Sequence, residues 1–363
     1  MARINLQQLK HSYGSTSGGE PDYALKEINA VWEDGGSYAL LGPSGCGKTT
    51  LLNIVSGLLV PSEGKVIFDD VDVTNMPTSE RNIAQVFQFP VVYDTMTVFD
   101  NLAFPLRNRG FAESEVIPRV NEIAKMLELE DSLKKRAARL TADGKQKISL
   151  GRGLVRKDVS AIMFDEPLTV IDPHLKWKLR SKLKELHQRL GITMIYVTHD
   201  QTEALTFAEQ VVVMHDGLVV QTGTPVELFE YPKHTFVGNF IGSPGMNILP
   251  AENINGEIGF EGCLIKTSSK ADLQTLQGKL EIGIRPEFIS FVDECSDSNN
   301  SSAIPVEIIR VNDLGKFKIV EVKHEQHLIK LISPEQYSIP SLSPRIIFDP
   351  DKTRLYADSW VVD

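Results

Sequence analysis

The sequence predicts an α/β domain followed by a small domain built from β-strands. A glycine-rich segment, Gly42 to Thr50, follows an apolar run typical of a buried strand and precedes apolar residues at helical spacing. Later apolar runs end in polar residues, as strands buried on both faces of a parallel sheet do. From about Ser243, short strand-like runs alternate with turn residues, which indicates a separate β-domain.

Length, charge and cysteine content limit the functions that the chain can have. With 363 residues it is long enough for at least two domains, each with its own core. The net charge of -10 gives no general attraction to DNA or acidic lipid, so we predict no nucleic-acid partner. The three cysteines are scattered, which suits a reducing compartment. No stretch approaches the ~20 apolar residues of a membrane span, so we expect any membrane connection to pass through a partner.

The N-terminal residues are expected to form strands that lead into the glycine-rich segment. Apolar and polar residues alternate between residues 3 and 41, with a Gly/Ser-rich break at Gly14 to Gly19. Tyr13 stands directly before this break, where an aromatic ring can stack on a base. The alternative is an ordinary strand tyrosine, so Tyr13 alone does not indicate a ligand.

The glycine-rich segment fits the phosphate-binding pattern G-x-x-x-x-G-K-[ST] at every fixed position. Its glycines let main-chain N–H groups surround phosphates, and the following helix points its positive end at them. Lys48 can reach the terminal phosphates and the Thr49 hydroxyl can ligate Mg²⁺, whereas Cys46 is expected only to fill space. We therefore predict that ATP binds here. The predicted contacts are Gly42, Pro43, Ser44, Gly45, Cys46, Gly47, Lys48, Thr49 and Thr50.

Polar residues end three of the later strands and are expected to meet at one edge of the sheet. Gln88 is placed to touch Mg²⁺ or the attacking water, and Asp165 to hold Mg²⁺. Glu166 is predicted to polarise the water that attacks the γ-phosphate. His199 is placed to contact that phosphate, although a lone histidine is more often structural. The alternative for the two carboxylates is to cap the turn at Pro167.

The remaining pattern divides the chain into domains. Residues 98–157 repeat apolar positions at a helical period and predict a largely helical insertion. We expect a first domain over residues 1–242, with a helical subdomain at about 89–158, and a β-barrel domain of the OB type over residues 243–363. The polar stretch Ser296 to Ser302 lies in the second domain, which shows no catalytic cluster. A regulatory or docking role is predicted for it.

Together these motifs resemble those of the ATPase subunits of ABC transporters, most closely the subunits of bacterial uptake systems for sugars and polyols. The resemblance covers nearly the whole chain, and the tail Gly283 to Glu287 is similar to the regulatory β-barrel of that branch. The base-stacking aromatic, glutamine loop, magnesium aspartate, catalytic glutamate, D-loop aspartate and switch histidine of the family match Tyr13, Gln88, Asp165, Glu166, Asp172 and His199.

The resemblance implies a subunit that hydrolyses ATP with Mg²⁺ held near Thr49, Gln88 and Asp165. In this family two ATPase subunits enclose two ATP molecules, each between the phosphate loop of one subunit and the signature sequence of the other. Closure moves two membrane permeases, and a periplasmic solute-binding protein delivers the solute. The chain is therefore expected at the cytoplasmic face of the inner membrane.

The chain departs from the family in its signature sequence. The family residues Leu-Ser-Gly-Gly-Gln are replaced by Leu140, Thr141, Ala142, Asp143 and Gly144. Ala142 and Asp143 stand where glycine backbone approaches the γ-phosphate bound by the partner. Like charges ~4 Å apart repel by about 4 kcal/mol at an effective dielectric constant of ~20, which Mg²⁺ and Lys145 would partly offset. This signature is expected to form a degenerate site with the partner.

The degenerate signature predicts an asymmetric pair of ATPase subunits. The chain's own phosphate loop, Glu166 and His199 are complete, so we expect a heterodimer with a different ATPase subunit. The altered signature and its neighbours are most similar to those of glycerol-uptake subunits. Two alternatives are a soluble ABC ATPase of nucleic-acid metabolism or translation, and a regulatory subunit that does not hydrolyse ATP.

Overall fold

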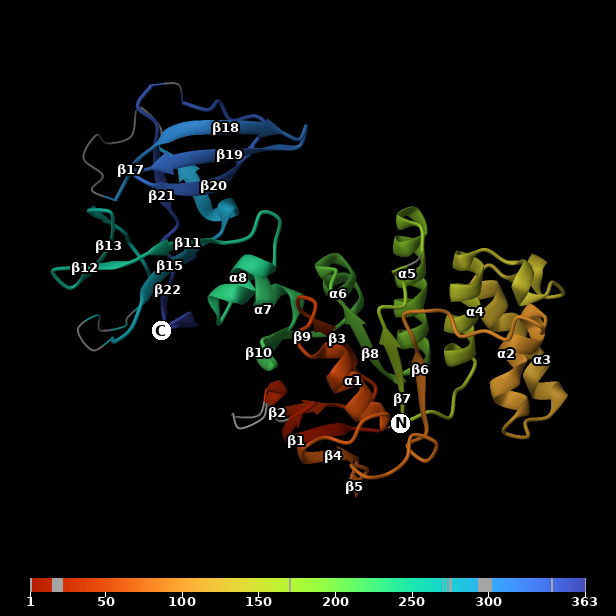
Figure 1. The fold of residues 1–363 in the computed structure, drawn as a ribbon. Helices are drawn as coiled ribbons and strands as arrows, with labels where there is room; N and C mark the ends of the chain where they lie inside the picture. Colours follow the sequence, from red (N-terminus) through yellow and green to blue (C-terminus); the bar gives the residue numbers. More distant parts are fainter. Residues whose placement is uncertain are drawn as a thin grey trace. The chain divides into compact units, whose positions relative to one another are not determined.

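The structure is a computed structural model that describes residues 2–14, 22–169, 171–269, 271, 273, 276–292, 302–340 and 342–362. The chain divides into two compact units, Met1–Pro225 and Val226–Asp363, each with its own core. The first unit mixes helices and strands, and the second consists mainly of strands (Figure 1). The predicted order of an α/β domain and a small β-domain is confirmed. Parts of two predicted segments, 14–19 and 296–302, lie outside the described residues.

A six-stranded sheet forms the centre of the first unit. Its order is β10-β9-β3-β8-β7-β6, and all strands except β10 run parallel. β3, β7 and β8 are buried along their whole length, which explains their largely apolar sequences. The carboxyl ends of the parallel strands therefore meet at one edge. The strands are Ser37–Leu41 (β3), Ile83–Val86 (β6), Ala161–Asp165 (β7), Thr193–Thr198 (β8), Gln210–His215 (β9) and Leu218–Gly223 (β10).

A smaller antiparallel sheet contains the N-terminal strands. β1 pairs with β2 and with β4, and β5 extends the sheet beyond β4. One face packs with α1 and β3 around a common core, to which Leu6, Ile28 and Leu52 contribute. The alternating sequence thus supplies a second layer that supports the start of α1. The elements are Ile4–Ser12 (β1), Tyr23–Trp32 (β2), Lys48–Ser56 (α1), Glu63–Phe68 (β4) and Val71–Asp72 (β5).

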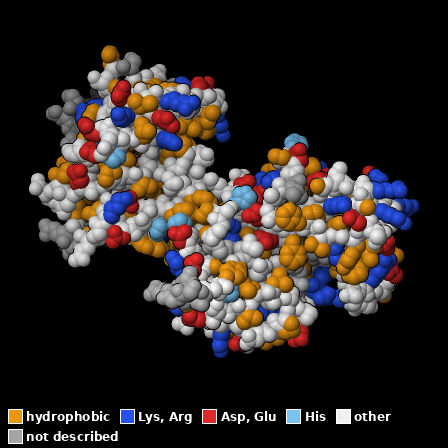
Figure 2. Space-filling view, viewed as in Figure 1, with side chains coloured by type: hydrophobic (Ala, Val, Ile, Leu, Met, Phe, Trp, Pro, Cys, Tyr) orange, Lys and Arg blue, Asp and Glu red, His pale blue; other side chains and the backbone are white. Residues whose placement is uncertain are grey.

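Helices α2, α3 and α4 pack together and form the predicted helical insertion. A Cβ at Gly151 would lie 2.4 Å from Cδ2 of Leu102, so glycine allows α4 to approach α2 closely. Lys and Arg outnumber Asp and Glu here, and their side chains gather on this part of the surface (Figure 2). No helix within the described residues has the length and apolar character needed to cross a membrane. The helices of the first unit are Val98–Arg107 (α2), Glu113–Met126 (α3), Ala142–Leu154 (α4), Pro173–Leu190 (α5) and Gln201–Phe207 (α6), with 3-10 turns at Glu130–Ser132 and Ala137–Arg139.

The second unit arranges its described strands in four small antiparallel sheets around a separate core. Ile282, Val320 and Ile346 are fully or almost fully buried in that core. The β-rich prediction for this region is therefore confirmed. Its elements are Pro225–Glu230 (α7), Thr235–Phe240 (α8), Asn247–Pro250 (β11), Glu252–Ile254 (β12), Glu257–Phe260 (β13), Cys263–Leu264 (β14), Leu280–Ile284 (β15), Pro286–Phe288 (a 3-10 turn), Ile289–Phe291 (β16), Ile304–Pro305 (β17), Glu307–Asp313 (β18), Phe317–His324 (β19), His327–Pro334 (β20), Arg345–Phe348 (β21), Arg354–Ala357 (β22) and Trp360–Val361 (β23).

Arg285 ties α7 and α8 to the strands of the second unit. The side chain is 2% exposed, and its guanidinium group donates to four main-chain carbonyl oxygens of these helices and their ends. Burial lowers the pKa of Arg285 to about 10, which leaves it a cation at neutral pH. The acceptors are Leu228, Phe229, Gly238 and Ile241. The second compact unit begins after Pro225, whereas the sequence suggested a boundary after residue 242.

Candidate functional site

The glycine-rich segment forms a tight turn between β3 and α1. Gly45 and Gly47 adopt left-handed backbone conformations, with φ of 83° and 100°. A Cβ at Gly47 would lie 2.5 Å from Cδ2 of Leu25, so glycine is required where the turn meets β2. α1 begins at Lys48, and the N–H groups of its first turn point at the loop. The turn therefore has the features of an anion-binding site.

Lys48 lies across this turn. Its side chain is buried, and Nζ donates hydrogen bonds of 2.8 Å to the main-chain oxygens of Gly42 and Pro43. The ammonium group is thus held inside the loop, where phosphate oxygens can replace the carbonyl acceptors. Cys46 lies beside it, with Sγ 3.8 Å from Nζ, and burial raises the pKa of its thiol. A buried, protonated thiol is consistent with the space-filling role predicted for Cys46.

Asp165 ends β7 and faces Thr49 at the start of α1. The Thr49 hydroxyl donates a hydrogen bond of 3.3 Å to Oδ1 of Asp165. Burial raises the pKa of Asp165, and the hydrogen bond from Thr49 opposes this shift. The two oxygen atoms fit a hard cation such as Mg²⁺, whose remaining ligands would be phosphate and water. Gln88 donates to Glu166 rather than facing this pair, so its role as a metal ligand stays a prediction.

Glu166 carries a carboxylate that is held from three sides. Oε1 lies 3.0 Å from Nδ1 of His199, and Oε2 accepts hydrogen bonds of 3.4 Å from Gln88 and from the hydroxyl of Thr169. The Glu166 backbone has φ of 45°, a strained value for a residue other than glycine. Thr169 was not among the residues predicted for the site. Its spacing of three residues from Glu166, in the turn after β7, was the only available signal.

Tyr13 reaches the start of α1 from the end of β1. Its hydroxyl lies 3.0 Å from Oγ1 of Thr50, and its ring is 67% exposed. The His11 ring packs edge-on against the Tyr13 ring, with 4.7 Å between ring centroids. A cavity of about 630 Å³ is lined by Tyr13 together with Tyr23, Gly45 and neighbouring residues. The structure therefore places an exposed aromatic face beside the phosphate loop, where a base can stack.

The altered signature begins α4. The Thr141 hydroxyl caps the helix by accepting a hydrogen bond of 3.3 Å from the N–H of Gly144. Asp143 pairs along the helix with Lys147, with 3.7 Å between Oδ2 and Nζ. Lys145 was expected to offset the Asp143 charge, but it pairs with Asp94 at 2.8 Å. Lys147 offsets the Asp143 charge instead, because residues four apart share a helix face.

The signature segment and the D-loop residue do not join the cluster around Glu166. Among the described residues, no hydrogen bond or ion pair connects residues 141–144 with Lys48, Asp165 or Glu166. Asp172 caps α5 by accepting a hydrogen bond of 2.9 Å from the N–H of His174. Within one chain, hydrogen bonds thus join Thr49 to Asp165 and Glu166 to His199, while the signature residues share none of these contacts.

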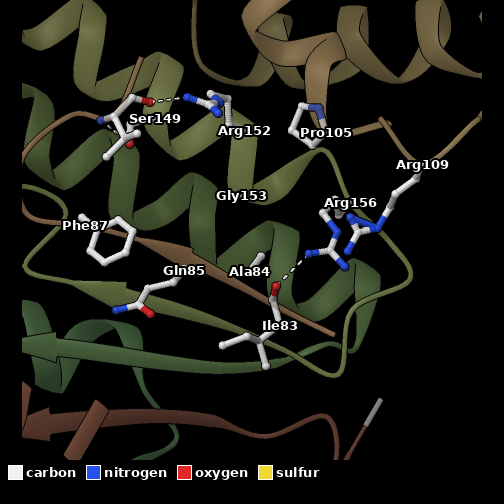
Figure 3. A pocket seen from close by; sticks show the side chains of 11 residues that line it. Ile83, Ala84, Gln85, Phe87, Pro105, Arg109, Ser149, Arg152, Gly153 and Arg156 are labelled. Atoms are coloured by element: carbon white, nitrogen blue, oxygen red, sulfur yellow. Dashed lines mark hydrogen bonds between the residues drawn. The ribbon is translucent and has the colours of Figure 1, made fainter. Parts of the chain in front are cut away.

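A second cavity, of about 270 Å³, lies beside the edge strand β6 and under α4 (Figure 3). Three arginines, Arg109, Arg152 and Arg156, line it, and no acidic residue is among its described lining residues. Arg156 donates a hydrogen bond of 2.7 Å to the main-chain oxygen of Ile83 on β6. Asp158 lies 3.7 Å from both Arg109 and Arg156, so it offsets only part of their charge. The cavity is therefore suited to an acidic group.

Known proteins resemble this chain over most of its length. A family model described as ABC transporter matches residues 25–169. The chain is 40% identical over 316 residues to the sn-glycerol-3-phosphate import ATP-binding protein UgpC of Psychromonas ingrahamii, which covers 87% of this chain and 80% of the relative. It is 37% identical over 331 residues to UgpC of Bordetella avium, with 91% and 88% covered. The uncharacterized ABC transporter ATP-binding protein YurJ of Bacillus subtilis is 37% identical over 343 residues, with 91% and 90% covered.

Two solved structures have a similar fold over about three fifths of the chain. The ATP-binding cassette MJ0796, in a dimeric post-hydrolysis state with ADP and Pi, matches with a TM-score of 0.55 and 29% identity. It covers 61% of this chain and 98% of that chain. The protein cbiO1 of Clostridium perfringens, part of the ABC transporter complex cbiONQ, matches with a TM-score of 0.56 and 28% identity, covering 63% and 90%.

Replacing Asp165 by Asn is expected to raise the thermal unfolding midpoint at neutral pH. The raised pKa of Asp165 means that the folded chain holds this proton more tightly than the unfolded chain does, so ionisation at higher pH destabilises the fold. The gain should disappear below the ordinary pKa of 3.8, where the wild-type carboxyl is protonated in both states. Thermal unfolding across this pH range measures the effect.

The exposed Asp131, replaced by Asn, is the control for this experiment. An Asp165→Asn chain that is less stable than wild type at neutral pH would contradict the expectation. An equal gain in the Asp131→Asn chain would contradict it as well.

Proposed function

This chain belongs to the ABC transporter family, and we propose that it is the ATP-hydrolysing subunit of an importer for a small polyol of the glycerol type. The cluster of Glu166, His199 and Gln88 beside the phosphate loop is the observation that supports hydrolysis in this chain. Relatives named as sn-glycerol-3-phosphate import ATP-binding proteins support glycerol or its phosphate as the solute.

The phosphate loop and Tyr13 are proposed to bind ATP. The N–H groups at the start of α1 and the ammonium group of Lys48 would contact the phosphates, after Lys48 releases the oxygens of Gly42 and Pro43. The exposed ring of Tyr13 would stack on the adenine, which holds the base without reading its edge. Lys48 thereby exchanges two neutral acceptors for charged ones, which favours a triphosphate over an uncharged ligand.

Glu166 is proposed as the general base for the attacking water. His199 and Thr169 hold its carboxylate, and Gln88 donates to the same group from the segment after β6, so the carboxylate is oriented before the water arrives. His199 would also contact the γ-phosphate. Thr49 and Asp165 would hold Mg²⁺, which supplies positive charge to the transferring phosphate group.

Replacing Glu166 by Gln is expected to lower ATP turnover of the assembled transporter by about 100-fold or more, because the amide cannot accept the proton of water. ATP binding should persist, since the phosphate loop is unchanged. Phosphate release and binding of a fluorescent nucleotide measure the two properties. Uptake of labelled glycerol, glycerol 3-phosphate and a sugar in the same preparation identifies the solute.

Glu185→Gln, which removes an exposed carboxylate of α5, is the matched control and should retain turnover. Undiminished turnover in the Glu166→Gln transporter would refute the proposed base. Uptake of the sugar alone would refute the proposed solute.

We further propose that the chain pairs with a different ATPase subunit. Ala142 adds a side chain where the family has glycine, and Asp143 adds a carboxylate that Lys147 only partly neutralises at 3.7 Å. Both changes weaken the contact with a γ-phosphate held by the partner, so a homodimer would carry two impaired sites. A partner with an intact signature would complete the site formed by this chain's Lys48 and Glu166.

Restoring the signature tests this asymmetry. In a transporter that carries Glu166→Gln here, only the partner's phosphate loop can hydrolyse ATP. Adding Ala142→Gly and Asp143→Gly is expected to raise that residual turnover about tenfold, because a repulsive charge leaves the γ-phosphate contact. Single-turnover hydrolysis measures the change, and Asp143→Asn alone separates charge from backbone effects. Unchanged turnover, or purification of the chain as a homodimer with permeases, would contradict the proposal.

The permeases are proposed to contact residues 87–93 and the arginine-lined cavity. Phe89 and Val91 are 73% and 50% exposed, although they are apolar. Gln88 lies in the same segment and donates to Glu166, so a contact here can influence the active site directly. A permease segment with apolar side chains and an acidic group would match this surface. The chain would thereby act at the cytoplasmic face of the inner membrane, with the solute-binding protein reached only through the permeases.

Replacing Phe89 by Ser is expected to reduce copurification of the chain with its permeases about tenfold, because an exposed aromatic anchor is lost. Nucleotide binding by the separate chain should remain, since Phe89 lies outside the phosphate loop and its side chain is 73% exposed. Trp177→Ser removes an exposed aromatic residue of α5, 68% accessible, and is the control. Undisturbed copurification of the Phe89→Ser chain, or an equal loss with Trp177→Ser, would place the permease contact elsewhere.

A regulatory or docking role is proposed for the second unit. Its segment Gly283 to Glu287 carries Arg285, whose hydrogen bonds fix α7 and α8. These contacts support a structural role for Arg285 itself.

A further inference from the structure

Glu203 is a buried carboxylate that the proposed mechanism does not use. It lies on α6 and is 3% exposed. Oε2 accepts hydrogen bonds of 3.0 Å from the hydroxyl groups of Tyr196 and Thr198, and Oε1 accepts one of 3.3 Å from Nζ of Lys176. Burial and the nearby Glu203 carboxylate raise the pKa of Tyr196 well above 10, so the phenol remains a donor. Both carboxylate oxygens therefore have partners.

These donors come from two elements, β8 and α5. Tyr196 and Thr198 end β8 immediately before His199. Lys176 lies in the first turns of α5, the helix that Asp172 caps. One carboxylate consequently joins the end of β8, which leads to His199, to the start of α5, which Asp172 caps.

The main chain around His199 is fixed by the same group of residues. Oγ1 of Thr198 accepts a hydrogen bond of 3.0 Å from the N–H of Asp200, and Oδ1 of Asp200 accepts one of 3.2 Å from the N–H of Glu203. The His199 side chain is 54% exposed and meets Glu166 at 3.0 Å. Because the His199 side chain is half exposed, the position of its ring depends mainly on the main chain of residues 198–200, which these hydrogen bonds fix.

We propose that Glu203 is a positioning residue that holds His199 against Glu166 and links this pair, through Lys176, to the start of α5. The inference rests on the proposed function, in which His199 and Glu166 act on ATP. A charged group is suited to this task because one carboxylate accepts from several donors at once, and charged hydrogen bonds hold their geometry more firmly than neutral ones. Loss of Glu203 should impair turnover through His199 while leaving the phosphate loop intact.

A double-mutant cycle in the assembled transporter tests this inference. Glu203→Gln is expected to lower kcat for ATP about tenfold and to change KM for ATP less than about twofold. In a His199→Ala background the same substitution should cost less than about twofold more, because the residue through which it acts is gone. Glu185→Gln is again the control on α5. Thermal unfolding of each variant reports folding.

Each outcome decides between positioning and plain structural support. Equal losses of kcat in both backgrounds, a raised KM, or an unchanged kcat would overturn the inference. If the Glu203→Gln chain does not fold, Tyr196→Phe takes its place in the cycle, because it removes one hydrogen bond to the Glu203 carboxylate and keeps the aromatic ring. Turnover that survives Glu166→Gln would instead refute the proposed function, and this separates the two failures.

Discussion

The parallel register of β3, β7 and β8 is the constraint on which the site depends. Leu41 pairs with Thr198, and Asp165 pairs with Val197, so the chain leaves three adjacent strands at nearly the same level. Glu166 and His199, which follow two of these strands, are then within hydrogen-bond distance of each other. The register of these buried, apolar strands determines where each strand ends. The positions of the strand ends in turn determine how close Asp165, Glu166 and His199 lie to one another.

The sequence predicted those parts of the site that depend on local pattern. The phosphate loop is recognisable because its glycines adopt left-handed backbone conformations that a short segment of sequence determines. Glu166 and His199 are recognisable because they follow strands that appear in the sequence as apolar runs. Thr169 and Glu203 were not found, because their contacts depend on the shape of a turn and on which face α6 turns to the sheet. Such contacts arise only once the elements have packed.

The same distinction accounts for the two differences in detail. Lys147 lies four residues from Asp143, and helical spacing alone would have selected it over Lys145. The helices α7 and α8, which follow Pro225, are held instead by Arg285, which is distant from them in sequence. Short helices after the last strand of a sheet carry no local mark of the unit to which they belong.

The backbone of Glu166 has a consequence for how this chain tolerates sequence change. A left-handed conformation is strained for glutamate and relaxed for glycine, so the residue that suits the main chain differs from the one that suits the proposed chemistry. Asp165 presents a similar conflict, because its buried carboxylate destabilises the fold when ionised and is also proposed to hold Mg²⁺. Selection for heat resistance alone would therefore enrich chains that have lost hydrolysis, and only simultaneous selection for growth on the transported solute would preserve both residues.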